Sequence, residues 1–289
     1  MRILIFGATG MLGHKLAQRL SREHETWSAI RRDFSEVEKF GIFRSETTIS
    51  RVNVTNETHV FELLNKYRPD VVINTAGIIK QRMTSEAEVI AVNAAFPRVL
   101  AEMASDFGCR LISISTDCVF TGRRGNYSEK DAPDADDLYG QSKHLGEVSG
   151  ANCLTIRTSL IGRELFHSTG LLEWFLANRN NQVAGYTNAI FSGFPTVVFA
   201  DIISEIISNY PKISGLLHIA SKPISKFALL QLINTEYECG ADILPTTEPR
   251  IDRSLDSTKF IQITGYPQLE WGEMIRRMHD DPTPYDSWK

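Results

Sequence analysis

The stretch that decides the fold is RILIFGATGMLG at residues 2–13. Residues 3–6 form a short continuous apolar run, which is typical of a parallel strand covered on both faces. Three glycines, each three residues from the next, occupy 7–13, and from Met11 onward leucines recur every fourth residue, the pattern of an amphipathic helix. A strand, a glycine turn and a helix start together favour an anion at the turn, and a dinucleotide pyrophosphate is the natural occupant.

Strands and helices continue to alternate along the first half of the chain. Apolar runs and helical spacing predict further strands at 26–30, 48–54, 71–73, 110–114 and 153–156, and helices at 60–67 and 89–107. Such alternation means βαβ units with right-handed crossovers. The fold class expected is therefore α/β, with a doubly wound parallel (Rossmann) sheet.

After Gly162, strands and helices no longer alternate regularly. Helical spacing is seen at 171–176, 198–210, 227–233 and 269–278, and one apolar run at 216–219 resembles a further buried strand. We expect a dinucleotide-binding domain at residues 1–160, with a strand near 215–220 returning to it. A smaller, mostly helical substrate-binding lobe at 161–289 would be interleaved with that domain. Residues 280–284, with two prolines, are expected to form a loose tail.

Composition excludes several classes of protein. The 289 residues include 31 Lys and Arg against 35 Asp and Glu, a net charge of −4, so there is no basic excess for binding nucleic acid. The 42% hydrophobic and 23% charged fractions are ordinary for a soluble globular protein. Four separate cysteines fit a reducing cytoplasm. The apolar run at the N-terminus is too short for a signal peptide or a membrane span, so no membrane partner is expected.

The choice of dinucleotide depends on the residues about 20 positions past the glycine loop. An Asp or Glu at the end of the second strand would bind the 2′-hydroxyl of NAD. This chain has Arg31 and Arg32, whose guanidinium groups suit a 2′-phosphate, followed by Asp33. We therefore favour NADP(H), with NAD(H) as the alternative.

Tyr139 and Lys143 lie one helical turn apart in YGQSK. A neighbouring ammonium favours the phenolate, so it is expected to lower the tyrosine pKa from its usual value of about 10 toward the working range. The run 111–117, LISISTD, is a strand that ends in polar residues, and ligands bind at the carboxyl ends of such strands. Thr116 is therefore expected to hydrogen-bond a carbonyl that Tyr139 protonates.

These residues, in this order, resemble the extended short-chain dehydrogenase/reductase superfamily, and more narrowly the dTDP-4-dehydrorhamnose reductase family of nucleotide-sugar reductases. The resemblance spans nearly the whole chain. The matching pieces are GATGMLG at 7–13, NTAG at 74–77, STDCVFTG at 115–122, YGQSK at 139–143, RTS at 157–159, Pro195-Thr196 and RSLDSTK at 253–259.

The resemblance implies a role for each matching residue. The catalytic residues would be Thr116, Tyr139 and Lys143. The cofactor would contact Gly7, Thr9, Gly10, Met11, Leu12, Gly13, Arg31, Arg32, Asn53, Val54, Thr75, Ala76, Gly77, Tyr139 and Lys143. The substrate would contact Thr116, Asp117, Ser192 and Arg250.

The implied reaction is NADPH-dependent reduction of the 4-keto group of a nucleotide-linked deoxy sugar, in polysaccharide or O-antigen sugar biosynthesis. The sequence departs from the family pattern at Cys118, Leu160 and 78–82, all near the expected sugar pocket, so dTDP and UDP sugars both stay open. A 4,6-dehydratase would need a glutamate where Cys118 stands. An epimerase, and a regulatory subunit like the β subunit of methionine adenosyltransferase, which binds NADP without catalysis, remain alternatives.

Weaker signals complete the sequence-based prediction. The seven histidines form no metal-binding spacing, so no catalytic metal is expected. Arg163 and Arg250 are candidates for contacting a diphosphate, and Trp174 is more readily a core or lid residue than a pocket residue. The sequence leaves a homodimer open.

Overall fold

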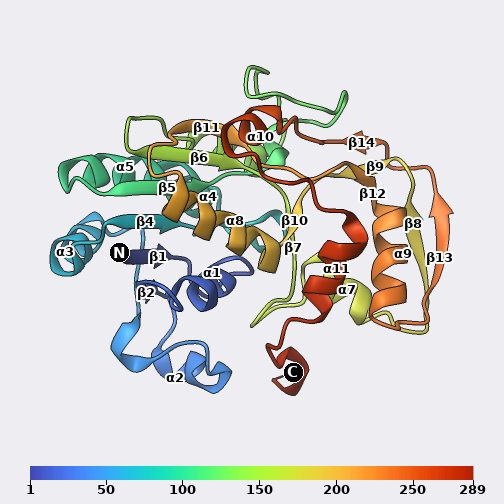
Figure 1. The fold of residues 1–289 in the computed structure, drawn as a ribbon, viewed down its shortest axis with the longest axis horizontal. Coiled ribbons are helices and arrows are strands. Elements are labelled where there is room, and N and C mark those ends of the chain that lie inside the picture. The colour runs from blue at the N-terminus through green and yellow to red at the C-terminus, as the bar shows by residue number, and fades with distance from the viewer. Residues whose placement is uncertain (289) are drawn as a thin grey trace.

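A seven-stranded parallel sheet forms the centre of the computed structural model, which describes residues 1–288 (Figure 1). The order β11-β6-β5-β4-β1-β2-β3 confirms the predicted doubly wound sheet. The order reverses between β1 and β4, and ligands of such sheets bind beyond the carboxyl ends of the strands at this point. The strands are β1 (Arg2–Phe6), β2 (Glu25–Ala29), β3 (Thr48–Ile49), β4 (Val71–Asn74), β5 (Arg110–Ile114), β6 (Cys153–Arg157) and β11 (Gly215–His218).

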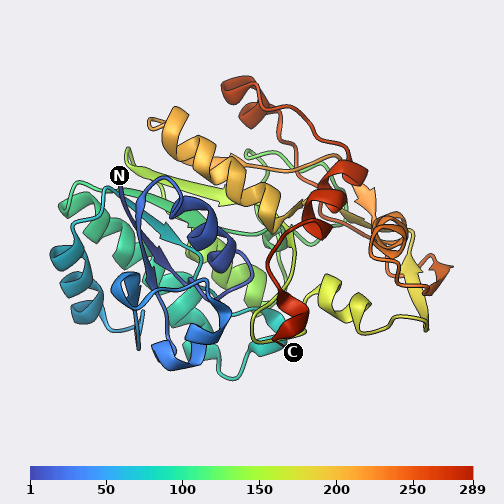
Figure 2. The ribbon, with the colours of Figure 1, turned by 60° about the horizontal axis from the view of Figure 1, so that its bottom comes forward.

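Helices cover both faces of the sheet, because successive side chains of a strand point to opposite sides. Ile3 and Ile5 of β1 belong to a core cluster with α1 (Gly13–Leu20) and α8 (Thr196–Asn209). Leu4 and Phe6 belong to a second cluster with α3 (Glu57–Tyr67) and α5 (Phe96–Asp106). Figure 2 shows the gold helix α8 and the teal helix α5 on opposite sides of the sheet.

Two predicted elements of this region differ in the structure. The strand expected at 48–54 is reduced to Thr48–Ile49, and the chain leaves the sheet at once. The helix expected at 89–107 is three consecutive pieces, α4 (Glu86–Ile90), a π-helical turn (Ala91–Ala95) and α5. A π turn often marks a functional site, and this one carries Asn93.

Beyond β6 the chain forms short strands and helices beside the sheet, and β11 returns to pair in parallel with β6. The division into two units at residue 160 stays a prediction. The helices are α7 (Leu171–Leu176), α9 (Lys226–Glu236), α10 (Thr258–Thr264) and α11 (Trp271–His279). The additional strands are β7 (Leu160–Ile161), β8 (Gln182–Tyr186), β9 (Ala189–Phe191), β10 (Phe194–Pro195), β12 (Ile224–Ser225), β13 (Asp242–Thr246) and β14 (Ile251–Asp252). They form three small sheets that the sequence analysis missed.

The prediction of a loose C-terminal tail is wrong. The Lys15 ammonium lies 2.5 Å from the Asp281 carboxylate and also donates to the Thr283 hydroxyl. The buried Tyr285 phenol lies 2.6 Å from Nε2 of His14, which is itself buried. These contacts tie the end of the chain to α1, the helix that follows the glycine loop. Among residues 1–288, no helix combines the length and apolar character needed to cross a membrane.

Candidate active site

The glycine loop joins β1 to α1 and touches the segment that follows β4. Gly7 has a φ of +77°, and a Cβ on it would lie 2.6 Å from the backbone nitrogen of Ala76. Only glycine tolerates both conditions, so this turn requires it. The N–H of Gly10 donates to the Gly7 carbonyl at 2.9 Å, whereas the N–H groups of Met11 and Leu12 have no acceptor among residues 1–288. Free N–H groups at a helix start are suited to hold an anion.

A cavity of about 560 Å³ extends from this loop along the carboxyl ends of β1, β2 and β4. Most residues predicted to bind the cofactor lie in its wall, and so do further residues that were not predicted to bind it. The predicted ones are Gly7, Thr9, Gly10, Arg31, Arg32, Asn53, Val54, Thr75, Ala76 and Gly77, and the additional ones include Arg82, Phe166 and His167. The unbonded N–H groups of the loop and the arginines at the far end fit the phosphates of a dinucleotide such as NADP.

A second cavity, of about 330 Å³, continues from the first. Gly10, Arg82 and the segment 75–77 belong to the walls of both. The structure brings the three predicted catalytic residues together here with several neighbours. Its wall also contains Met11, Leu12, Thr116, Asp117, Cys118, Tyr139, Lys143, Thr158 and Ser159. Gly13 lines neither cavity, because it packs against the backbone of Gly7 and Ala8.

Tyr139 is carried by the first turn of α6 (Leu138–Leu145). The Asp137 carboxylate caps this helix by accepting from the N–H of Gly140 at 2.8 Å. A Cβ on Gly140 would lie 2.2 Å from the carbonyl oxygen of Cys118, so glycine lets the helix press against the loop after β5. That contact sets Tyr139 beside Thr116, which follows the same strand.

The prediction of a lowered tyrosine pKa is wrong for this arrangement. Burial raises the pKa of Tyr139, the Cys118 and Asp117 side chains raise it further, and a hydrogen bond with Thr116 opposes them. Lys143 does not offset the loss of hydration. Tyr139 is therefore a neutral phenol at physiological pH, the form that can give a proton.

Lys143 lies one turn further along α6, and its side chain is buried. Its ammonium donates to the backbone carbonyl of Ile114 at 2.8 Å. Burial lowers the pKa of Lys143 to about 8, with the nearby Glu147 opposing the change. The lysine thus titrates close to neutrality.

Asn93 is a site residue that the sequence analysis missed. Its amide accepts from the N–H of Ile78 at 2.8 Å, donates to the Ile78 carbonyl at 2.9 Å and donates to the Ser142 hydroxyl at 3.2 Å. It therefore fixes the cavity segment after β4 to helix α6. The sequence did offer one sign of this role, since Asn93 is a single polar residue within the apolar run AVNAAF.

Asp117 and Cys118 line the second cavity with side chains that burial keeps from ionising readily. Burial raises the pKa of Asp117, and the Arg253 guanidinium opposes the change. Burial raises the pKa of Cys118 to about 12, so its thiol stays protonated and is a poor nucleophile.

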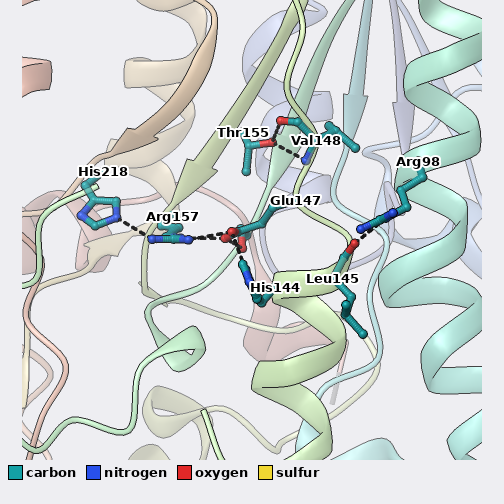
Figure 3. A network of polar contacts seen from close by, with 9 residues as sticks. Arg98, His144, Leu145, Glu147, Val148, Thr155, Arg157 and His218 are labelled. Atoms are coloured by element: carbon teal, nitrogen blue, oxygen red, sulfur yellow. Dashed lines mark hydrogen bonds and ion pairs between the residues drawn. The ribbon is translucent and has the colours of Figure 1, made fainter. Parts of the chain in front are cut away.

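A buried ion pair supports the strand ends behind the cavity (Figure 3). The Arg157 guanidinium of β6 donates twice to the Glu147 carboxylate, each time at 2.7 Å. Glu147 also accepts from the Ser115 hydroxyl at 2.7 Å, directly before Thr116 in the chain. His218 of β11 contacts the other side of the guanidinium, 3.3 Å from Nη1. This network joins the segments that directly follow α6 and β5 to the strands β6 and β11.

Several residues named in the sequence-based prediction lie away from both cavities. The Ser192 hydroxyl is buried and accepts from the N–H of Leu255, and Arg250 is exposed. Arg163 pairs with Glu173 and Asp286, and Trp174 is 40% exposed. None of these four lines either cavity. Within residues 1–288, no three His, Cys, Asp or Glu side chains are grouped to hold a metal ion.

Comparisons with known proteins agree with this geometry. The profile of the family described as RmlD substrate binding domain matches residues 1–281. A dTDP-4-dehydrorhamnose reductase of Aggregatibacter actinomycetemcomitans is 28% identical over 96% of this chain and 98% of its own length. A Streptomyces antibioticus protein named "Probable dTDP-4,6-dihydroxy-2-methyloxan-3-one 4-ketoreductase" is 30% identical over 75% of this chain and 70% of its own.

The fold has solved relatives. The crystal structure of the dTDP-4-dehydrorhamnose reductase of Bacillus anthracis str. Ames, in complex with NADP, superposes with a TM-score of 0.78. It covers 96% of this chain and 98% of that one at 22% identity. The glycine-loop fold, the paired cavities and the profile match together show that the chain belongs to the RmlD substrate binding domain family.

Proposed function

We propose that this protein uses NADPH to reduce the 4-keto group of a nucleotide-linked deoxy sugar. The single observation that carries the proposal is the position of Thr116, Tyr139 and Lys143. All three line a cavity that continues from the glycine-loop cavity and shares walls with it. The reductase and ketoreductase names of the relatives support the same chemistry. We place the reaction in polysaccharide or O-antigen sugar biosynthesis in the cytoplasm, where the four unpaired cysteines would stay reduced.

The glycine loop, Asn53-Val54 and Thr75-Ala76-Gly77 would hold the dinucleotide, which would supply the reducing equivalents when bound. Negative charge would then develop on the sugar carbonyl oxygen. Tyr139, a neutral phenol, would give that oxygen its proton, and Thr116 would stabilise the charge with a hydrogen bond. Lys143 would make the resulting phenolate tolerable through its positive charge.

The proposed reaction is tested by NADPH oxidation with a panel of dTDP- and UDP-linked 4-keto sugars. Turnover of at least one member, with the product reduced at C4, supports the proposal. Binding of NADPH without turnover of any member would favour the regulatory-subunit alternative. Interconversion of sugar epimers without net NADPH consumption would favour the epimerase alternative.

The pH dependence of reduction should report Lys143. With a pKa of about 8, its ammonium is present below that pH and is lost above it. We expect kcat/KM for reduction to fall as the pH rises through about 8, because kcat/KM follows the free enzyme. Tyr139, whose pKa is raised, stays protonated over this range. In Lys143→Arg the charge persists, so the fall should vanish whatever the absolute rate. A wild-type profile that is flat to pH 10 would contradict this role.

The 2′-phosphate of NADPH should be bound at the end of β2. Arg31 has an 83% exposed side chain, 3.9 Å from Glu88, and is thus almost free to bind a ligand. The Arg32 guanidinium lies 3.9 Å from the centre of the Phe166 ring and pairs with Glu36. We expect Arg31→Ala/Arg32→Ala to weaken NADPH binding by roughly 10- to 100-fold, as for lost charged hydrogen bonds, and NADH binding little. Titration by nucleotide fluorescence measures both, and equal losses would refute the assignment.

A further inference from the structure

The loop after β4 places Arg82 over the junction of the two cavities, and it lines both. Its Nη2 donates to Oε1 of Glu164 at 2.9 Å and lies 3.4 Å from the hydroxyl of Thr169. Its Nε and Nη1 donors have no acceptor among residues 1–288. Because a guanidinium carries five N–H donors in a planar fork, Arg82 can serve Glu164 and a second anion together.

The segment 164–170, which contacts Arg82 through Glu164 and Thr169, contributes residues to the walls of both cavities. The buried Glu164 carboxylate accepts from the N–H groups of Thr169 at 2.7 Å and Gly170 at 3.0 Å, so the segment is folded tightly around it. A Cβ on Gly170 would lie 3.8 Å from the sulfur of Met11, in the glycine loop. This segment and the glycine loop therefore approach each other here, and residues of both line the smaller cavity.

Phe166, near the start of the segment, is fixed at the arginines that follow β2. The Phe166 ring lies under the Arg32 guanidinium and meets the Phe40 ring edge-on, with centroids 5.1 Å apart. Phe166 and His167 thereby complete the wall of the larger cavity. The segment is thus held at Phe166 as well as at its contacts with Arg82.

The charges in the groove favour an anion next to Arg82. Three arginines line the larger cavity, against one carboxylate, that of Glu88. Burial lowers the pKa of Arg82, Glu164 opposes the change, and Arg31 and Arg32 reinforce it. Each of these arginines has one carboxylate within 4 Å, yet in the wall of the larger cavity the cations outnumber the carboxylates. Glu164 is 7% exposed and would repel a diphosphate in the groove if Arg82 did not neutralise it.

We propose that Arg82 binds the diphosphate of the dinucleotide from the side opposite the glycine loop, with Glu164 fixing the orientation of its guanidinium. This inference rests on the proposed cofactor site. Arg82 is then a cofactor-binding residue supplied by the segment after β4, and Glu164 is a positioning residue. Both nicotinamide dinucleotides carry the diphosphate, so Arg82 should not discriminate between NADPH and NADH.

The test is a set of dissociation constants for NADPH and NADH, measured by fluorescence titration on the full chain. Arg82→Gln should weaken both by the same factor, roughly 10- to 100-fold, because hydrogen bonds to charged groups are lost. Arg82→Lys should recover part of the loss, since the charge remains without the fork. Glu164→Gln added to Arg82→Gln should also recover part, because the unpaired carboxylate is gone. Arg22→Gln removes the same charge at an exposed site and should change neither constant.

The other outcomes are equally decisive. Binding of both cofactors by Arg82→Gln within twofold of wild type would overturn the inference. Loss of NADPH binding with unchanged NADH binding would also overturn it, because Arg82 would then bind the 2′-phosphate. Thermal melting separates a folding failure from a binding loss, and Arg82→Lys provides the second variant. If the wild-type protein bound neither dinucleotide, the proposed function itself would fail; an unaffected Arg82→Gln against normal wild-type binding rejects only the role of Arg82.

Discussion

Tyr139→Phe is expected to lower kcat for sugar reduction by about 10²- to 10⁴-fold, the usual contribution of a positioned proton donor. The substitution removes only the hydroxyl and leaves the ring in place against α6 and the loop after β5. KM should therefore change little, as expected when an interaction made in the transition state is lost. Steady-state kinetics with the best substrate of the panel provides the measurement.

Two controls accompany this variant. NADPH binding should be unchanged in Tyr139→Phe, which shows that the loss is chemical. Cys118→Ala should retain most of the activity, because the thiol is protonated and no chemical step is assigned to it. Near-normal turnover of Tyr139→Phe together with an inactive Cys118→Ala would mean that the proposed mechanism is wrong.

Arg157→Met should destabilise the protein by about 3–5 kcal/mol, because it leaves the Glu147 carboxylate buried without its partner. The Arg157 side chain is 2% exposed and that of Glu147 is 11% exposed, so water replaces little of the lost interaction. The guanidinium also lies 5.1 Å from the centre of the Phe120 ring, a contact that is lost as well. Urea unfolding followed by circular dichroism measures the free energy of unfolding.

The double variant Glu147→Leu/Arg157→Met is the matched control. Replacing both members of a buried ion pair by apolar side chains is often nearly neutral, so the double variant should recover much of the stability lost in Arg157→Met. Recovery would show that the cost arises from the unpaired charge. If the free energy of unfolding of Arg157→Met were within about 1 kcal/mol of that of the wild type, Glu147 would instead find water or other donors.

Much of the fold could be predicted because its signals are local. The apolar run of β1, the glycines after it and the leucine spacing of α1 are contiguous in sequence, and each requires only neighbouring residues. The short strands β8, β9 and β13 gave no such signal, because their pairing is decided by segments far along the chain. β13, for example, pairs with β8, about sixty residues earlier. The loose tail predicted at 280–284 was mistaken for the same reason, since the partners of this region, His14 and Lys15, lie at the other end of the sequence.

The candidate site divides in the same way. Thr116, Tyr139 and Lys143 were found because their motifs lie at the end of a strand and on one helix face. Arg82, Glu164 and Asn93 were not, because the contacts that place each of them come from other elements. The direction of the Tyr139 pKa was mispredicted because spacing shows that a lysine is near but not how much water the phenol loses.

Because β11 returns to the central sheet, β6 gains its second neighbouring strand only after the chain has been synthesised as far as β11. Arg157 and His218, which meet in the finished protein, are 61 residues apart. At a ribosomal rate of about 5–20 residues per second, β6 remains an open edge for roughly 3–12 seconds after it emerges. During that interval its unpaired backbone groups are available to a neighbouring nascent chain. Synonymous codons that slow translation between the two strands would lengthen that exposure and raise the risk of aggregation without altering a single residue of the product.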